Sequence, residues 1–180
     1  LDDLCSSIRT FVSSLLTQSS TSTSSSHNAK LMMKTSLLLE KLSECKKMGG
    51  QTQENAATIV QLCMTLLSKF SYSSSLHDDM DARMRLSAYG CIENLVGKYP
   101  SCVDGMFFEV ADLLFKLLDK EIHDMTPRLL GAIGALRLAY TISSSSSSSL
   151  HLINDVIMRS RVSAESRKRV TAIEWVTTIF

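Results

Sequence analysis

The sequence predicts an all-α fold, and three features of the chain indicate it. Glycine and proline occur only seven and two times in 180 residues, whereas a β-rich domain of this length needs many tight turns built from them. Apolar residues recur at steps of three and four along most of the chain, which is the period of an amphipathic helix. Runs of serine separate these stretches, and no segment has a convincing strand pattern. We therefore expect about eight helices joined by serine-rich loops.

Two helices are expected on either side of the first serine-rich tract. The first covers about 2–17, where Ile8 and Phe11 belong to an apolar stripe. Residues 18–26 are almost entirely Ser and Thr and bury too little apolar surface to offset their ordering entropy, so a flexible loop is expected. The second helix covers about 28–47, because two lysines suit its last turn and a Gly-Gly pair follows.

The next two helices are expected over about 53–70 and 80–98. A polar break that includes residues 71–76 separates them, and Pro100 ends the second because proline cannot continue a helix. Three aspartates lie at the start of the second helix, where negative charge suits the positive end of the helix dipole. These are Asp78, Asp79 and Asp81. A metal or a basic partner is the alternative role for this acidic cluster.

Start signals mark the fifth and sixth helices. Ser101 follows a proline and precedes Asp104 by three residues, so the fifth helix is expected to begin at a Ser101 cap. Thr126 is a natural N-cap, and Pro127 fits the first helical position because its missing N–H needs no partner there. The sixth helix is expected to run to about Ile142.

Two more helices are expected after a further loop. Seven consecutive serines at 143–149 predict that loop. A helix over about 150–160 follows, and the last helix begins at Ser163 and continues to Ile179. Trp175 lies on this helix and is expected in the core or in a contact between repeats.

The second helices of successive pairs share a small residue that is flanked by apolar residues. Ala88, Ala132 and Ala172 occupy this position, spaced 44 and 40 residues apart, within the period of about 40–47 residues of HEAT and armadillo repeats. Arginines lie near the start of each of these helices, at Arg85, Arg128 and Arg169. The sequence resembles the HEAT-repeat family at these positions, most clearly over residues 81–88.

The resemblance implies one α-solenoid of antiparallel helix pairs over 1–180, whose second helices line a concave face. An irregular pair is expected at 1–50, where the resemblance fades, followed by repeat units at 54–100, 101–142 and 150–180. The chain begins without Met and ends within an apolar stretch, so we expect a piece of a longer protein. An ordinary helical bundle is the alternative architecture.

Composition and motifs argue against several classes of function. The net charge is only +1, which makes a whole-surface attraction to nucleic acid or membranes unexpected. The five cysteines are scattered without a C-x-x-C pair, which is typical of reduced thiols inside cells. The longest apolar stretch, 129–142, is shorter than the ~20 residues that cross a bilayer.

The sequence shows no constellation that indicates catalysis, a cofactor or a metal. It contains no nucleophile elbow, P-loop or dinucleotide fingerprint. The four histidines lie in or beside expected loops and are not paired at metal-ligand spacing. They are His27, His77, His123 and His151. We therefore expect a chain that is not an enzyme.

The remaining candidate is a binding surface rich in arginine. Its residues are Arg83, Arg85, Arg159, Arg161, Arg167, Lys168 and Arg169. By analogy with HEAT-type proteins, the expected function is an intracellular protein-interaction scaffold, cytoplasmic or nuclear, that binds proteins or peptides along the concave face. The alternative is a nucleic-acid or phosphoinositide module that uses the basic patch at 159–169.

Overall fold

The computed structural model describes residues 3, 6–8, 10–11, 14, 25–44, 52–71, 79–118, 120–121, 123–142, 158 and 166–179. Within these ranges the regular structure is helical throughout, which confirms the all-α prediction. The α-helices are α2 (Ser25–Glu44), α3 (Thr52–Ser71), α4 (Asp79–Lys98), α5 (Phe107–Leu118), α6 (Thr126–Ile142) and α8 (Ser166–Ile179). Two 3₁₀ helices, η1 (Pro100–Val103) and η2 (His123–Met125), precede α5 and α6.

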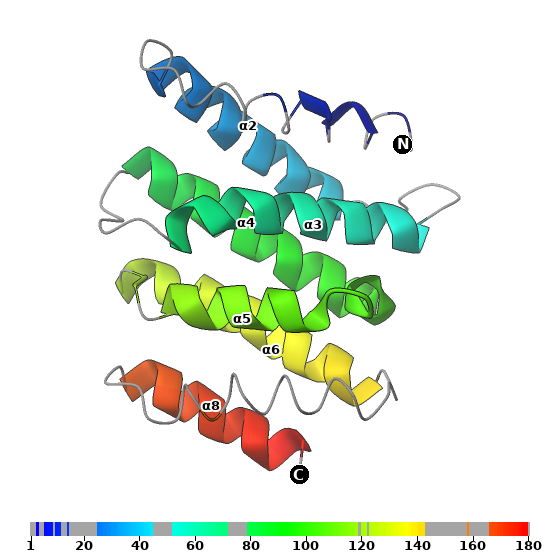
Figure 1. The fold of residues 1–180 in the computed structure, drawn as a ribbon, viewed down its shortest axis with the longest axis vertical. Coiled ribbons are helices and arrows are strands. Elements are labelled where there is room, and N and C mark those ends of the chain that lie inside the picture. Colours follow the sequence, from blue (N-terminus) through cyan, green and yellow to red (C-terminus); the bar gives the residue numbers. More distant parts are fainter. Residues whose placement is uncertain are drawn as a thin grey trace.

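The helices alternate between two layers (Figure 1). One layer contains α2, α4, α6 and α8, and we call it the even layer. Within it α4 packs against both α2 and α6, and α6 also contacts α8. The other layer contains α3 and α5, which contact each other, while α3 packs on α4 and α5 packs on α6. The core therefore lies between the layers and extends along the stack.

Small residues allow the helices of the even layer to approach the core closely. Ala88, Ala132 and Ala172, the alanines that recur in the sequence, are fully buried. The opposite layer supplies the bulk, because most side chains of α5 are buried, including Val110, Leu114 and Leu117. Alternating small and large residues fill such an interface without voids.

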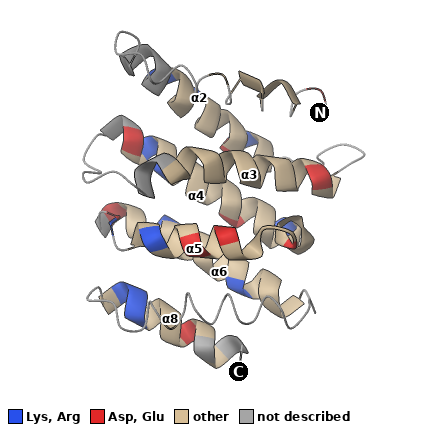
Figure 2. Cartoon of the chain, viewed as in Figure 1, with Lys and Arg blue, Asp and Glu red and all other residues tan. Residues whose placement is uncertain are grey.

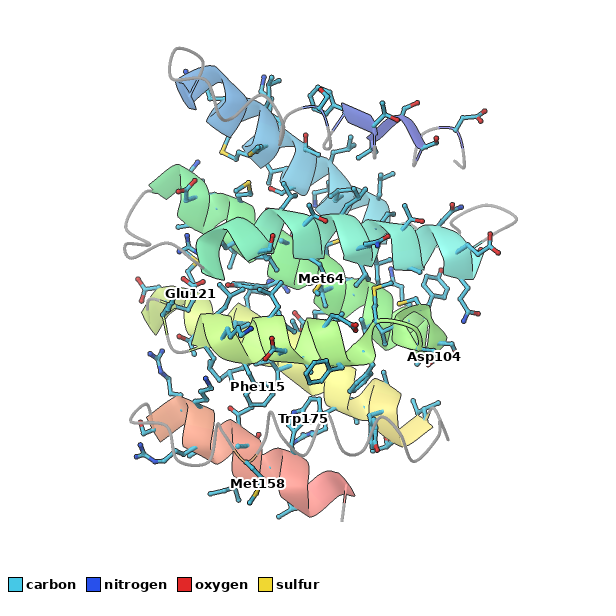
Figure 3. The ribbon with its side chains drawn as sticks, viewed as in Figure 1. Met64, Asp104, Phe115, Glu121, Met158 and Trp175 are labelled. Carbon is cyan, nitrogen blue, oxygen red and sulfur yellow. The ribbon has the colours of Figure 1, made fainter. Side chains whose placement is uncertain are left out.

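Trp175 of α8 belongs to this core, as the sequence predicts. Its side chain is 1% exposed. Its ring centroid lies 6.0 Å from that of Phe107 and 5.7 Å from that of Phe115, both on α5 (Figure 3). Phe107 also packs on Tyr140 of α6, at 5.3 Å. Trp175 thus joins α8 to the helices that precede it.

The start of the fifth helix differs from the prediction. Instead of a helix capped by Ser101, the chain forms η1 and a turn, and α5 begins six residues later at Phe107. Hydrogen bonds to the third residue back run from Cys102 N to Tyr99 O (2.9 Å) and from Met106 N to Val103 O (2.9 Å). This tighter turn buries the Cys102 and Val103 side chains, and Gly105 disfavours an α-helix through this segment.

The other boundaries agree closely where they can be compared. Helix α2 starts at Ser25, so Ser25 and Ser26 of the expected loop 18–26 are helical. Adding residues to a formed helix costs little, and serine is tolerated at helix starts. Helix α6 begins at Thr126 and ends at Ile142, as expected. Ser71 of the expected break 71–76 is the last residue of α3.

Several predictions fall wholly or partly outside the described residues. In the expected first helix the described residues are helical, namely Asp3, Ser6, Ser7, Ile8, Thr10, Phe11 and Ser14. Met158 is the helical residue described within the expected helix 150–160. Residues 18–24, 45–51, 72–78, 143–149 and 163–165 lie outside the description.

Candidate functional site

A cluster of three charged side chains connects helices of the even layer. Arg128 of α6 lies 3.1 Å from a carboxylate oxygen of Glu93 on α4 and 3.4 Å from one of Glu40 on α2. The Arg128 side chain is 43% exposed and that of Glu93 is 35% exposed, so the cluster lies on the outer face of the layer. Arg128 therefore joins α6 to the neighbouring helix α4 and also to α2, which lies on the other side of α4.

Two glycines provide the space for this cluster. A Cβ atom at Gly90 on α4 would lie 2.9 Å from the Glu40 carboxylate and 3.2 Å from the Arg128 guanidinium. A Cβ atom at Gly131 on α6 would lie 2.6 Å from the Glu93 carboxylate. Glycine inside a helix costs about 1 kcal/mol relative to alanine, and here it lets charged side chains cross the helix surface.

Further polar contacts join α2 to α4 along the same layer. The ammonium of Lys98 donates to the backbone carbonyl of Ser43 at 2.6 Å, near the last turn of α2 where carbonyls lack helical partners. The amide of Asn94 donates to the Ser43 hydroxyl at 3.2 Å. The Cys91 thiol lies 3.4 Å from the Leu39 carbonyl. The C-terminal ends of α2 and α4 are thereby held together.

Arg85, a candidate for the binding surface, lies in the interior instead. Its guanidinium makes two parallel hydrogen bonds to the Glu121 carboxylate, at 2.9 and 2.8 Å, and both side chains are 0% exposed. The Tyr89 hydroxyl donates to the same carboxylate at 2.7 Å. A buried charge needs such a partner, so Arg85 joins α4 to the connection between α5 and α6 and does not contribute to a surface.

The contacts with Glu121 act on the titration of two neighbouring groups, Arg85 and Tyr89. Burial opposes the charge of Arg85, but the hydrogen bond and negative charge of Glu121 raise the pKa of the guanidinium above its ordinary value. Burial, together with the charge of Glu121, raises the pKa of Tyr89 well above its ordinary value. The phenol therefore stays protonated and serves as a hydrogen-bond donor.

The structure separates the other predicted basic residues. Arg83 is exposed on α4, whereas Arg167, Lys168 and Arg169 are partly buried. Figure 2 shows the basic stretch at the start of α8. Consecutive helical residues turn by about 100° each, so these three cations do not share one face. The Arg167 guanidinium donates to the Thr126 hydroxyl at the start of α6. Arg159 and Arg161 lie outside the described residues.

The acidic cluster and the histidines are only partly described. Asp79 is the first residue of α4, and Asp81 is partly buried in its first turn, where an aspartate suits the helix dipole. Asp78, His77 and His151 lie outside the description, and His27 and His123 are described by backbone alone. Among the described residues, no group of three or more His, Cys, Asp or Glu side chains is arranged to hold a metal ion.

Sequence reasoning missed the partners in these contacts. Glu121 and Glu93 each pair with an arginine about one repeat away in the sequence, at separations of 36 and 35 residues. Oppositely charged residues spaced about one repeat apart could therefore have predicted these two ion pairs from the sequence. The role of Gly90 and Gly131 had no such signal, because it depends on side chains from other helices.

Comparison with known proteins supplies a family. Residues 2–180 match the family described as the N-terminal part of proteasome component ECM29, so the chain belongs to that family. No curated protein and no solved structure matches it. In the part of the chain that the structure describes, no helix has the length and apolar character needed to span a membrane.

Proposed function

We propose that this member of the ECM29 N-terminal family is a non-enzymatic scaffold segment inside the cell, which binds protein subunits of the proteasome assembly. The observation that carries the proposal is the family match, because it covers nearly the whole chain and its description names a proteasome component. The binding surface that we propose is the outer face of the even layer.

A HEAT-type solenoid of antiparallel helix pairs is the architecture that we propose for this scaffold. The alternation of helices between two layers supports it, as does the burial of the alanines that recur every 40 to 44 residues. Extended surfaces of stacked helices are suited to binding other proteins.

The contact between Arg128 and Glu40 supports a concave outer face for the even layer. These side chains belong to α6 and α2, which lie on opposite sides of α4, and their charged groups are 3.4 Å apart. Helices that pack side by side are about 8–10 Å apart, and a concave layer would shorten the distance that these two side chains have to span across α4. A partner would then contact α2, α4 and α6 together.

The chemistry of this face favours binding over catalysis. Its charged side chains form ion pairs between helices, as Glu93 and Arg128 do, and so hold the surface in shape. Apolar side chains also lie in solvent on α6, where Leu138 is 59% and Ile142 67% exposed. Exposed apolar residues beside polar ones are typical of protein interfaces.

The test is direct binding of the full chain to purified proteasomes, measured by biolayer interferometry. We expect saturable binding that an unrelated helical protein of similar net charge does not show. The double variant Leu138→Ser, Ile142→Ser should weaken binding at least about tenfold, since burying two such side chains contributes several kcal/mol.

The matched control lies in the opposite layer. Glu109 and Lys116 are exposed on α5, and their substitution by serine should leave the affinity unchanged. No binding by the unmodified chain would contradict the proposed function. Equal loss in both double variants would contradict the choice of face.

A further inference from the structure

A cavity of about 430 Å³ lies between α6 and α8 of the even layer. Three of the residues that line it are apolar, namely Leu130, Ile133 and Val170. Arg137 and Trp175 also line it and bring N–H donors to the site, and its other polar lining residues are Ser166, Arg167, Thr171 and Glu174. The few polar groups of such a cavity determine which ligand it can bind.

Two of these donors are buried without an acceptor. Among the described residues, no atom accepts a hydrogen bond from Trp175 Nε1–H or from Arg137 Nε–H. The Trp175 side chain is 1% exposed, and its ring is fixed between α8 and α5 by contacts with Phe107 and Phe115 (Figure 3). A buried donor that lacks an acceptor is uncommon in folded proteins and indicates that something else supplies one.

The charge of the cavity favours an anionic acceptor. Arg137 and Arg167 line it, whereas its lining contains one carboxylate, that of Glu174. The Arg137 guanidinium reaches Glu174 through Nη1 at 3.5 Å, which leaves Nε on the other side of the group. An arginine can present Nε and a terminal nitrogen together to one carboxylate.

We propose that this cavity binds an acidic side chain of a partner protein, presented next to an apolar side chain. The carboxylate would accept hydrogen bonds from Arg137 and Trp175, while the neighbouring apolar side chain packs on Leu130, Ile133 and Val170. Glu174 at the same site disfavours a group with two negative charges, so a carboxylate fits better than a phosphate. The inference rests on the proposed function, since it identifies the chemistry by which a proteasome subunit would be recognised.

The experiment uses Trp175 as a reporter, because it is the single tryptophan of the chain. The ¹⁵N-labelled full chain therefore gives one indole N–H signal. We would titrate it with the peptide acetyl-Leu-Glu-Leu-amide, with its Gln analogue, and with inorganic phosphate. We expect a saturable downfield shift with the Glu peptide, and at least tenfold weaker binding of the Gln peptide and of phosphate.

A glycine in the cavity wall allows the cavity to be filled without disturbing the fold. Gly134 lines the cavity, and a Cβ atom there would have no heavy atom within 4 Å. The variant Gly134→Leu should therefore fold, lose the response to the Glu peptide and bind proteasomes more weakly. Gly97 on α4 is equally open and lies outside the cavity lining, so Gly97→Leu should retain the peptide response.

The outcomes separate this inference from the proposed function. If the chain binds proteasomes but the Glu peptide shifts the indole signal no more than the Gln peptide or phosphate does, the inference is wrong, while the proposed scaffold function still stands. Undiminished proteasome binding by Gly134→Leu would also overturn it. If the peptide binds as expected and proteasomes do not, the carboxylate site stands and the proposed function fails.

Discussion

At the scale of single residues, the buried pair of Arg85 and Glu121 shows what the sequence could not reveal. An arginine near the start of a helix in a soluble protein is ordinarily exposed, and the sequence places Arg85 on a candidate surface. Its burial depends on a carboxylate 36 residues away, in the connection that follows α5. That contact exists only after the helices pack, so no local pattern predicts it.

Removing the charge of Glu121 should destabilise the fold strongly. The variant Glu121→Gln removes the carboxylate charge that pairs with the fully buried Arg85, which costs about 3–5 kcal/mol of unfolding free energy. Urea denaturation measures this loss. The control is Lys116→Gln, which breaks the partly exposed pair with Asp112 and should cost under about 1 kcal/mol. A cost for Glu121→Gln as small as the control would refute the role of the buried pair.

Buried thiol and phenol groups should make the fold sensitive to alkali. Burial, helped by the Asp104 carboxylate, raises the pKa of Cys102 from 9.0 to about 12. The unfolded chain therefore loses this proton first, so stability is complete below pH 9 and falls as the pH rises toward 12. One such group contributes a slope of about 1.4 kcal/mol per pH unit.

The variant Cys102→Ala isolates the contribution of this thiol. Denaturation midpoints measured between pH 8 and pH 12 should fall less steeply for the variant than for the unmodified chain. The raised pKa of Tyr89 contributes to the slope that remains. Identical profiles for the two proteins would show that Cys102 keeps its ordinary pKa in the fold.

At the scale of helices, the sequence predicts an element where it contains both a start signal and an apolar stripe. Helix α6 has Thr126 and Pro127 at its start, and both of its ends lie where they are expected. The predicted start of the fifth helix was wrong, because the signal at Ser101 indicates a helical turn but does not distinguish an α-helical turn from a 3₁₀ turn. The 3₁₀ turn prevails because it buries Cys102 and Val103, which is a tertiary effect.

Glycines of the even layer should respond differently to alanine according to their neighbours. Gly97→Ala adds a Cβ in open space and should stabilise α4 by about 1 kcal/mol. Gly131→Ala should raise the free energy of unfolding by about 0.5 kcal/mol less than Gly97→Ala does, since the Glu93 carboxylate must move away from Arg128. With Glu93→Ala already present, Gly131→Ala should recover the full gain. Equal gains in both backgrounds, measured by urea denaturation, would exclude this steric coupling.

At the scale of the whole molecule, spacing in the sequence predicts the architecture better than it predicts the surface. The recurring alanines identify the buried side of α4, α6 and α8, because close packing requires a small residue wherever two layers meet. The surface depends on which charged residues pair across helices. Arg128 and Glu40 are 88 residues apart, and their contact forms only when α2 and α6 pack on either side of α4. The donors of Arg137 and Trp175 likewise come together only when α8 packs on α6.

We propose that proteasome subunits bind the outer face of the even layer. Hydroxyl-radical footprinting of the full chain, free and bound to purified proteasomes, tests it most directly. We expect protection of Leu138, Ile142 and Val170 on α6 and α8, which are exposed in the free chain. Met64 on α3 and Phe108 on α5, partly buried in the opposite layer, should react equally in both states. Protection of Met64 and Phe108 with unchanged reactivity on α6 and α8 would contradict the claim.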